Sequence, residues 1–179
     1  MNRDAAAHVL VVCTGNTARS VMAAAMLGYL AECDGVVLRL STAGTHATCG
    51  QPVSARTLAA LAGVPELAEL SVSRHRSRQV EPADLERADL VVAMEADHVR
   101  WIRRHYPSSA GRAGTVRRVC RELAPGSSPL RTRVVALDLG SADLRPDEDV
   151  ADPAGGDKAA YTACAQELWS LCKQLSPRL

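Results

Sequence analysis

A cysteine and an arginine stand six residues apart near the start of the chain, and together they could hold and attack a phosphate group. Cys13 follows a run of apolar residues, and the polar segment after it contains Gly15 and ends at Arg19-Ser20. A thiolate is a strong nucleophile, and the planar guanidinium of Arg19 matches two oxygens of a phosphate group. The spacing therefore predicts covalent chemistry on a phosphorylated substrate, with Cys13 as the nucleophile.

The predicted elements place this segment where an anion can bind. The apolar run at 8–12 predicts a buried strand, and small and apolar residues at helical spacing predict a helix from Ser20 to about Cys33. In an open parallel sheet, ligands bind beyond the carboxyl ends of the strands. The N–H groups at the start of the helix are unpaired and its dipole attracts negative charge, so the segment favours the thiolate form of Cys13.

Strand and helix patterns alternate along the rest of the chain, which predicts an α/β fold with a parallel sheet. We expect a single domain over residues 1–179, a three-layer sandwich in which helices cover both faces of a four-stranded parallel sheet. The segment 141–157 is acidic and rich in Pro and Gly, so we expect an exposed loop there. Further strands are predicted at 36–41, 89–94 and 115–119, and further helices at 52–62, 82–87, 95–105, 129–140 and after residue 157.

Composition and charge exclude several classes of function. The 179 residues carry a formal net charge of +1 at pH 7, so no field of one sign favours nucleic acid or a membrane surface. No apolar run approaches the ~18 residues that a membrane span needs. The first ten residues, with Asp4 among them, lack the pattern of a signal peptide. We therefore expect a cytoplasmic protein, a monomer or weak dimer, that binds neither nucleic acid nor membrane.

The six cysteines do not form a metal-binding pattern. No two of them make a Cys-x-x-Cys pair, and no histidine clusters with them, so no metal is expected. Backbone amides and Arg19 can do for a phosphate what a metal does elsewhere, and no organic cofactor is implied. In a reducing compartment all six cysteines should be free thiols.

The motifs together resemble the low-molecular-weight protein tyrosine phosphatases. The segment CTGNTARS, Cys13 to Ser20, is similar to the phosphate loop of that family. The similar segments occur in the same order as in the family, and together they span most of the chain, with residues 107–150 the least matched. The other similar segments are STAGTHA at 41–47, HRSRQ at 75–79, the third predicted strand with its final Met and Glu at 88–95, and Asp152-Pro153 in the acidic loop.

The resemblance implies a role for each matched residue. Cys13 is expected to form a phosphocysteine, Arg19 to bind the phosphoryl oxygens, and Asp152 to protonate the leaving group and then activate water. A polar network is expected to hold the loop in its left-handed turn, formed by Asn16, Ser41 and His75. Ser20 is also expected to help expel the sulfur in the second step. The residues of the loop expected to bind the phosphoryl group are Thr14, Gly15, Asn16, Thr17, Ala18 and Ser20.

Several alternatives stay open for the acid. Four other carboxylates of the same loop compete with Asp152 for this role, because each lies within a few residues of it: Asp147, Glu148, Asp149 and Asp157.

Two departures from the usual family pattern bear on the substrate. Thr17 replaces a larger apolar residue, and its hydroxyl can hydrogen-bond a phosphoramidate nitrogen. Ala154 and two glycines follow Asp152-Pro153, where tyrosine-specific members usually place aromatic residues. Both features resemble the bacterial protein arginine phosphatases. A phosphotyrosine ring would then need an aromatic wall that only the fold can bring near, from Tyr161, Trp101 or Tyr106.

The sequence therefore predicts a phosphatase of phosphorylated proteins, with phosphotyrosine as the expected substrate and phosphoarginine as the alternative. An arsenate reductase that uses a small-molecule thiol is a further alternative, because arsenate mimics phosphate. A thiol relay is disfavoured because Cys164 and Cys172 lie about 12 Å apart on a predicted helix, too far to bridge. A non-catalytic phosphate-binding module is also disfavoured, since binding alone needs neither the thiol of Cys13 nor the acid Asp152.

Overall fold

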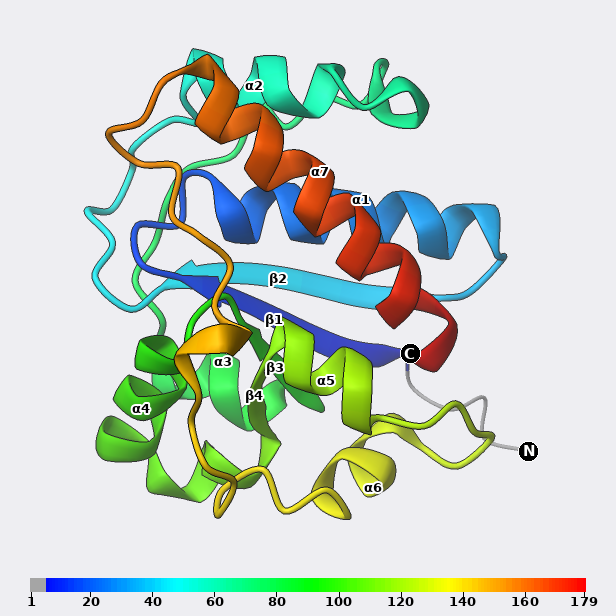
Figure 1. Cartoon of the computed structure of the whole chain (residues 1–179). Coiled ribbons are helices and arrows are strands. Elements are labelled where there is room, and N and C mark those ends of the chain that lie inside the picture. Colours follow the sequence, from blue (N-terminus) through cyan, green and yellow to red (C-terminus); the bar gives the residue numbers. More distant parts are fainter. Residues whose placement is uncertain (1–5) are drawn as a thin grey trace.

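A parallel sheet of four strands runs through the centre of the molecule (Figure 1). This computed structural model describes residues 6–179; the N-terminal five residues, which include Asp4, lie outside it. The strand order is β2-β1-β3-β4, and all pairs are parallel. The predicted α/β sandwich is confirmed. The strands are β1 (Ala7–Cys13), β2 (Leu38–Gly44), β3 (Leu90–Ala93) and β4 (Ala113–Thr115).

Helices cover both faces of the sheet, and β1 contributes side chains to both cores. Val9, Val11 and Cys13 pack in the core under α1 (Arg19–Cys33) and α7 (Lys158–Leu175), whereas Leu10 and Val12 pack in the core on the opposite face. This double burial explains the continuous apolar run of the strand. The other helices are α2 (Ala55–Ala62), α3 (Pro82–Arg87), α4 (Ala96–His105), α5 (Val116–Glu122) and α6 (Leu130–Val135), with short 3₁₀ turns at Pro65–Leu67, Pro107–Arg112, Pro146–Glu148 and Ser176–Arg178.

The fourth strand was predicted at the wrong place. The expected strand 115–119 is the start of helix α5, and the strand itself is the preceding segment β4. Thr115 causes the change of structure, because its side chain accepts a hydrogen bond from the Arg118 N–H and caps the helix. The buried residues Val116, Val119 and Cys120 recur at helical spacing, which is the signal that identifies the helix.

Other predicted bounds also differ from the structure. β2 starts two residues later than the predicted 36–41 and continues to Gly44, while α2 starts after its N-cap Ser54 rather than at Pro52. The predicted helix 129–140 is helical only over α6, and the chain then turns through Asp138, whose φ is 47°. The segment 141–157 is not simply an exposed loop, because Glu148 and Val150 are buried.

The carboxyl ends of the strands lie at one edge of the molecule, where the loop after β2, the start of α4 and the chain before α7 also lie (Figure 1). Within residues 6–179, no helix is long and apolar enough to cross a membrane. The same residues contain no group of three or more His, Cys, Asp or Glu side chains that could hold a metal ion.

Candidate active site

The segment between β1 and α1 curls around the sulfur of Cys13. The backbone N–H of Asn16 donates a hydrogen bond to the Cys13 Sγ at 3.3 Å, and the Ser20 hydroxyl lies 3.0 Å from the same atom. Asn16 has a φ of 53°, a left-handed conformation that costs most residues energy but that Asn tolerates. Together these contacts form a compact loop with a buried sulfur at its base.

A polar network around Asn16 holds this loop in shape. The Asn16 side chain donates to the Ser20 hydroxyl at 3.0 Å and accepts from the Arg78 backbone N–H at 3.0 Å. The Nε2 of His75 donates to the Asn16 carbonyl oxygen at 2.8 Å. Asn16 and His75 thus belong to one network, which also includes the backbone of Arg78. Because the Asn16 side chain is fully buried, these hydrogen bonds satisfy groups that water cannot reach.

Ser41 does not join the network, and its predicted supporting role is wrong. Its hydroxyl lies 2.8 Å from Nε2 of His8, and Ser41 pairs with Leu10 in the middle of β2, an edge strand of the sheet. Side chains alternate along a strand, so the neighbouring Thr42 faces the opposite way and lines a cavity together with His75. The sequence showed two adjacent hydroxyls in this segment but not which of them lies on the side of His75.

Arg19 is buried, and four groups fix its guanidinium. Nη1 donates to the carbonyl oxygen of Val150 at 3.0 Å and lies 2.6 Å from a carboxylate oxygen of Glu95. Nη2 donates to the Thr14 hydroxyl at 3.1 Å and lies 2.5 Å from a carboxylate oxygen of Asp152. A buried charge with this set of partners has a fixed plane. Because these four contacts use the N–H groups of both Nη atoms, a phosphoryl group that binds there must take the place of a carboxylate oxygen.

Glu95 and His98 belong to the site, and the sequence analysis did not assign them to it. The Nδ1 of His98 accepts the backbone N–H of Glu95 at 3.1 Å, so the ring proton is on Nε2, which lies 2.9 Å from the Thr14 hydroxyl. Burial, with a smaller effect of nearby Arg19, lowers the pKa of His98 to about 3. The imidazole is therefore neutral, although a carboxylate oxygen of Glu95 lies 3.3 Å from it.

A signal for both residues was present in the sequence. Glu95 follows the third strand almost directly, and His98 comes three residues later, in the first turn of α4. The carboxyl end of a strand next to β1 must lie beside the loop that follows β1. Polar residues at that point are candidates for the same site.

Asp152 contacts Arg19, and it does so from a partly exposed position. Its side chain is 36% exposed, so it can reach both the guanidinium and a bound substrate. Its second carboxylate oxygen accepts the backbone N–H of Ala154 at 3.0 Å, which fixes the side-chain orientation. The alternatives for the acid have other partners: Asp147 pairs with Arg145, Glu148 with Arg118 and Arg121, Asp149 accepts the Ala96 N–H, and Asp157 caps α7.

The loop after β2 lies against the phosphate-loop residues and carries an aromatic contact. The backbone N–H of His46 donates to the Thr14 carbonyl oxygen at 3.0 Å, and the His46 ring meets the Trp101 ring edge-on at 6.1 Å between centroids. Tyr106 packs behind Trp101. Tyr161 is buried in the core and cannot form an exposed wall. Of the three aromatic residues considered, Trp101 is the one linked to the loop.

The segment HRSRQ supports this second loop as well as the first. Gln79 donates to the Thr45 carbonyl oxygen at 2.8 Å and accepts the Ala47 N–H at 2.9 Å. The Ser77 hydroxyl donates to the Thr48 carbonyl oxygen at 2.6 Å. One short segment therefore connects the two loops that border the site.

Four of the other five cysteines do not suit a thiol relay with Cys13: Cys33, Cys120, Cys164 and Cys172. All six cysteines are free, and Cys33 lies at the opposite end of α1 from the site, about 21 Å away at 1.5 Å per residue. Burial raises the pKa of Cys120 to about 11 and that of Cys164 to about 12, and it also raises the pKa of Cys172. Buried thiols of this kind behave as core residues.

Comparisons with known proteins agree on one family. Residues 8–124 match the family model described as low molecular weight phosphotyrosine protein phosphatase. A protein-arginine-phosphatase of Geobacillus stearothermophilus is 29% identical over 174 residues, which cover 96% of this chain and 95% of that protein. A low molecular weight protein-tyrosine-phosphatase of Streptomyces coelicolor is 31% identical over 168 residues, which cover 89% and 85% of the two chains.

Solved structures of the same kind have a similar fold. A low molecular weight protein tyrosine phosphatase from T. tengcongensis superimposes with a TM-score of 0.75 at 28% identity, covering 97% of this chain and 100% of that one. An arginine phosphatase mutant with a phosphorylated active-site serine has a TM-score of 0.74 at 26% identity, covering 94% and 93%.

Proposed function

The chain belongs to the low molecular weight phosphotyrosine protein phosphatase family, and we propose that it hydrolyses phosphotyrosine in proteins through a phosphocysteine on Cys13. One observation carries this proposal: the loop that surrounds the Cys13 sulfur also positions Arg19, whose guanidinium contacts Asp152. Nucleophile, oxyanion-binding group and acid therefore converge on one point, which is what phosphoryl transfer without a metal requires.

The reaction then has two steps. In the first, the Cys13 thiolate attacks phosphorus, the bond between phosphorus and the tyrosine oxygen breaks, and Asp152 gives its proton to that oxygen. In the second, Asp152 takes a proton from water, the water oxygen attacks phosphorus, and the phosphorus–sulfur bond breaks. The Ser20 hydroxyl, 3.0 Å from Sγ, stabilises the thiolate as it leaves. Arg19 and the loop amides bind the three equatorial oxygens throughout.

The pair formed by His46 and Trp101 supports phosphotyrosine as the substrate. The loop after Asp152-Pro153 carries Ala154 where an aromatic wall is usual in the family, and His46 instead connects Trp101 to the phosphate-binding loop. A phenyl ring bound above the loop can contact these two rings. Contacts between aromatic groups contribute about 0.5–1.5 kcal/mol each.

Phosphoarginine is the second candidate substrate. The Thr17 hydroxyl can accept a hydrogen bond from the guanidinium of phosphoarginine, and Ala154 leaves room beside the acid. The Geobacillus relative, which matches nearly the whole chain, is a protein-arginine-phosphatase. In this reaction the phosphorus–nitrogen bond breaks, and Asp152 protonates the leaving nitrogen.

The test is phosphate release from two peptides that differ only in phosphotyrosine or phosphoarginine, with Cys13→Ser as the blank. We expect faster turnover of phosphotyrosine. A preference for phosphoarginine would overturn the substrate but not the chemistry, and Thr17→Val, which removes only the hydroxyl, should then reduce that preference. Release no faster than in the Cys13→Ser variant for either peptide would overturn the proposed function itself.

A further inference from the structure

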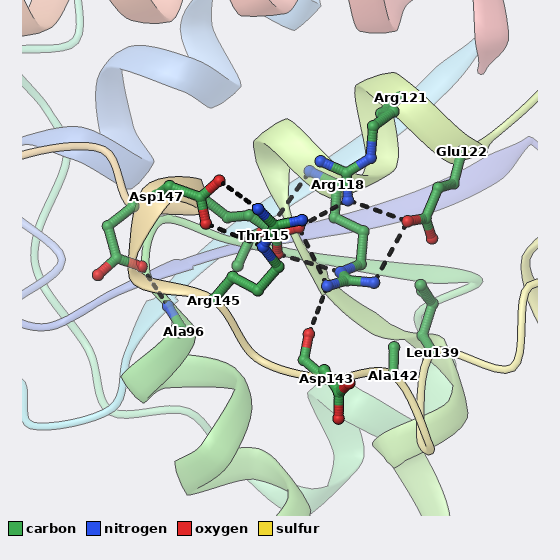
Figure 2. A network of polar contacts seen from close by, with 12 residues as sticks. Ala96, Thr115, Arg118, Arg121, Glu122, Leu139, Ala142, Asp143, Arg145 and Asp147 are labelled. Atoms are coloured by element: carbon green, nitrogen blue, oxygen red, sulfur yellow. Dashed lines mark hydrogen bonds and ion pairs between the residues drawn. The ribbon is translucent and has the colours of Figure 1, made fainter.

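A second polar centre lies next to the candidate site, around the carboxylate of Glu148. This side chain is 1% exposed, although it stands in a segment expected to be an open loop. Oε1 of Glu148 lies 3.0 Å from Nη2 of Arg118 and 2.6 Å from Nη2 of Arg121. Oε2 accepts hydrogen bonds from Nε of Arg118 and from the Thr115 hydroxyl, both at 3.1 Å. Figure 2 shows Thr115, Arg118 and Arg121 close together in a network of polar contacts.

Glu148 is ionised there. Its burial by itself would raise the pKa, but hydrogen bonds from Arg121, Arg118 and Thr115 outweigh that effect and lower it. A buried carboxylate is costly without such partners, and replacing one partner of a buried pair is strongly destabilising. The contacts therefore attach the segment around Glu148 firmly to β4 and α5.

The two residues after Glu148 are attached as well. Asp149 accepts the backbone N–H of Ala96 at 2.6 Å, at the start of α4. The Val150 N–H donates to the Met94 carbonyl oxygen at 2.8 Å, and the Val150 carbonyl oxygen accepts from Arg19 at 3.0 Å. Only Ala151 separates this attached stretch from Asp152. The segment that leads to the acid is thus held by contacts of three consecutive residues, Glu148, Asp149 and Val150.

We propose that Glu148 is a positioning residue for Asp152: its buried contacts with Arg118, Arg121 and Thr115 hold the acid-bearing segment so that the Asp152 carboxyl lies at Arg19 before the substrate binds. This inference rests on the proposed role of Asp152 as the acid. It describes an acid-bearing segment that is anchored before the substrate binds, so that only the Asp152 side chain has to leave Arg19 and turn to the leaving group. Glu148 itself touches no reacting atom and acts through the backbone of residues 148–152.

Glu122 provides a matched control. It is also a glutamate that contacts both Arg118, at 3.2 Å, and Arg121, at 3.0 Å. It lies on α5 together with those arginines, so it does not connect them to the acid-bearing segment. The substitutions Glu148→Gln and Glu122→Gln remove the same charge from the same two partners, and only the first weakens the attachment of Asp152.

The experiment compares kcat/KM for two substrates, p-nitrophenyl phosphate and phenyl phosphate, whose leaving groups differ in their need for a proton. Nitrophenolate leaves readily without an acid, and phenolate does not. Glu148→Gln should lower kcat/KM for phenyl phosphate about tenfold and for p-nitrophenyl phosphate less than about threefold. Asp152→Asn should show the same selectivity with larger losses, and Glu122→Gln should stay within about twofold on both.

The outcomes separate the two proposals. An equal loss on both substrates, or no loss, in Glu148→Gln would overturn the positioning role while Asp152→Asn still shows the selective loss. No selective loss in Asp152→Asn would overturn the role of Asp152 as the acid. If thermal unfolding shows that Glu148→Gln does not fold, Arg121→Gln is measured instead, because the half-exposed Arg121 leaves Arg118 on Glu148. It should show a smaller loss that is again selective for phenyl phosphate, and a non-selective one would count against the proposal.

Discussion

Glu95 places a carboxylate oxygen 2.6 Å from Nη1 of Arg19, while Asp152 contacts Nη2 of the same guanidinium at 2.5 Å. The two carboxylates come from different parts of the fold, one from the start of α4 and one from the segment before α7. Because each contacts a different nitrogen, together they fix the plane of the guanidinium. The orientation of Arg19 therefore depends on Glu95, from another part of the fold, as well as on the loop that carries the arginine.

Replacement of Glu95 by glutamine should lower kcat/KM about tenfold, because it weakens a charge-assisted contact worth about 1.5–3 kcal/mol and leaves Arg19 less well oriented. Asp97→Asn is the matched control. Asp97 lies on α4, is 80% exposed and pairs with Arg100. An exposed ion pair contributes little energy, so the loss of this one should change kcat/KM less than twofold. Steady-state kinetics with p-nitrophenyl phosphate measure both. Equal effects of the two substitutions would contradict this role of Glu95.

Gly44 should not tolerate a side chain. A methyl group at this position would clash with the Thr14 carbonyl oxygen and lie 2.8 Å from the Ala47 Cβ, so Gly44→Ala pushes the two loops apart. Overpacking of this kind costs about 1–3 kcal/mol of the free energy of unfolding, and activity should fall with it. Gly111→Ala is the control, because no atom lies within 4 Å of the added methyl group. Urea denaturation should find Gly44→Ala clearly less stable than Gly111→Ala, and equal midpoints would count against the close approach.

The neutral state of His98 predicts how stability depends on pH. Unfolded His98 binds a proton as the pH falls through about 6.5, whereas burial holds its pKa at about 3 in the folded protein. Between these values the unfolded state binds more protons, so the free energy of unfolding falls as the pH falls. From pH 7 to pH 5 this residue should account for a loss of roughly 2 kcal/mol.

Urea denaturation of the wild-type protein and of His98→Gln at both pH values provides the measurement. The variant should be less stable at pH 7, because it loses the contacts with Glu95 and Thr14, but its stability should change less between pH 7 and pH 5. Identical pH dependence in the two proteins would show that His98 is not held neutral.

Trp101 should contribute to the binding of the substrate's aromatic ring and not to the binding of its phosphate group. If a phosphotyrosine ring contacts the pair formed by Trp101 and His46, Trp101→Ala should raise KM for a phosphotyrosine peptide about three- to tenfold, which corresponds to the loss of one aromatic contact. Inhibition by inorganic phosphate, which has no ring, should be unchanged. A matching loss of affinity for phosphate would indicate that Trp101 supports the loop and does not contact the ring.

Local patterns were sufficient to predict much of this protein. The apolar run before Cys13, the glycine that follows and the helical spacing after Arg19 predict a strand, a turn and a helix, and these elements place the loop. Cys13, Asn16, Arg19 and Ser20 lie within eight residues, so one local turn brings them together, and His75 and Arg78 then hold Asn16 in place. The alternation of strands and helices likewise predicted a parallel sheet, because parallel neighbours require crossovers.

Tertiary structure decided what local patterns leave open. Ser41 and Thr42 are adjacent hydroxyl residues, and only the packing of β2 determines which one faces His75. The five carboxylates between 147 and 157 look alike in sequence, yet each has different partners in the folded chain, and Asp152 is the one that contacts Arg19. Glu95 and His98 reach the site because β3 pairs with β1. Such contacts join residues far apart in the chain, and their energies depend on burial and distance, which exist only once the chain has folded.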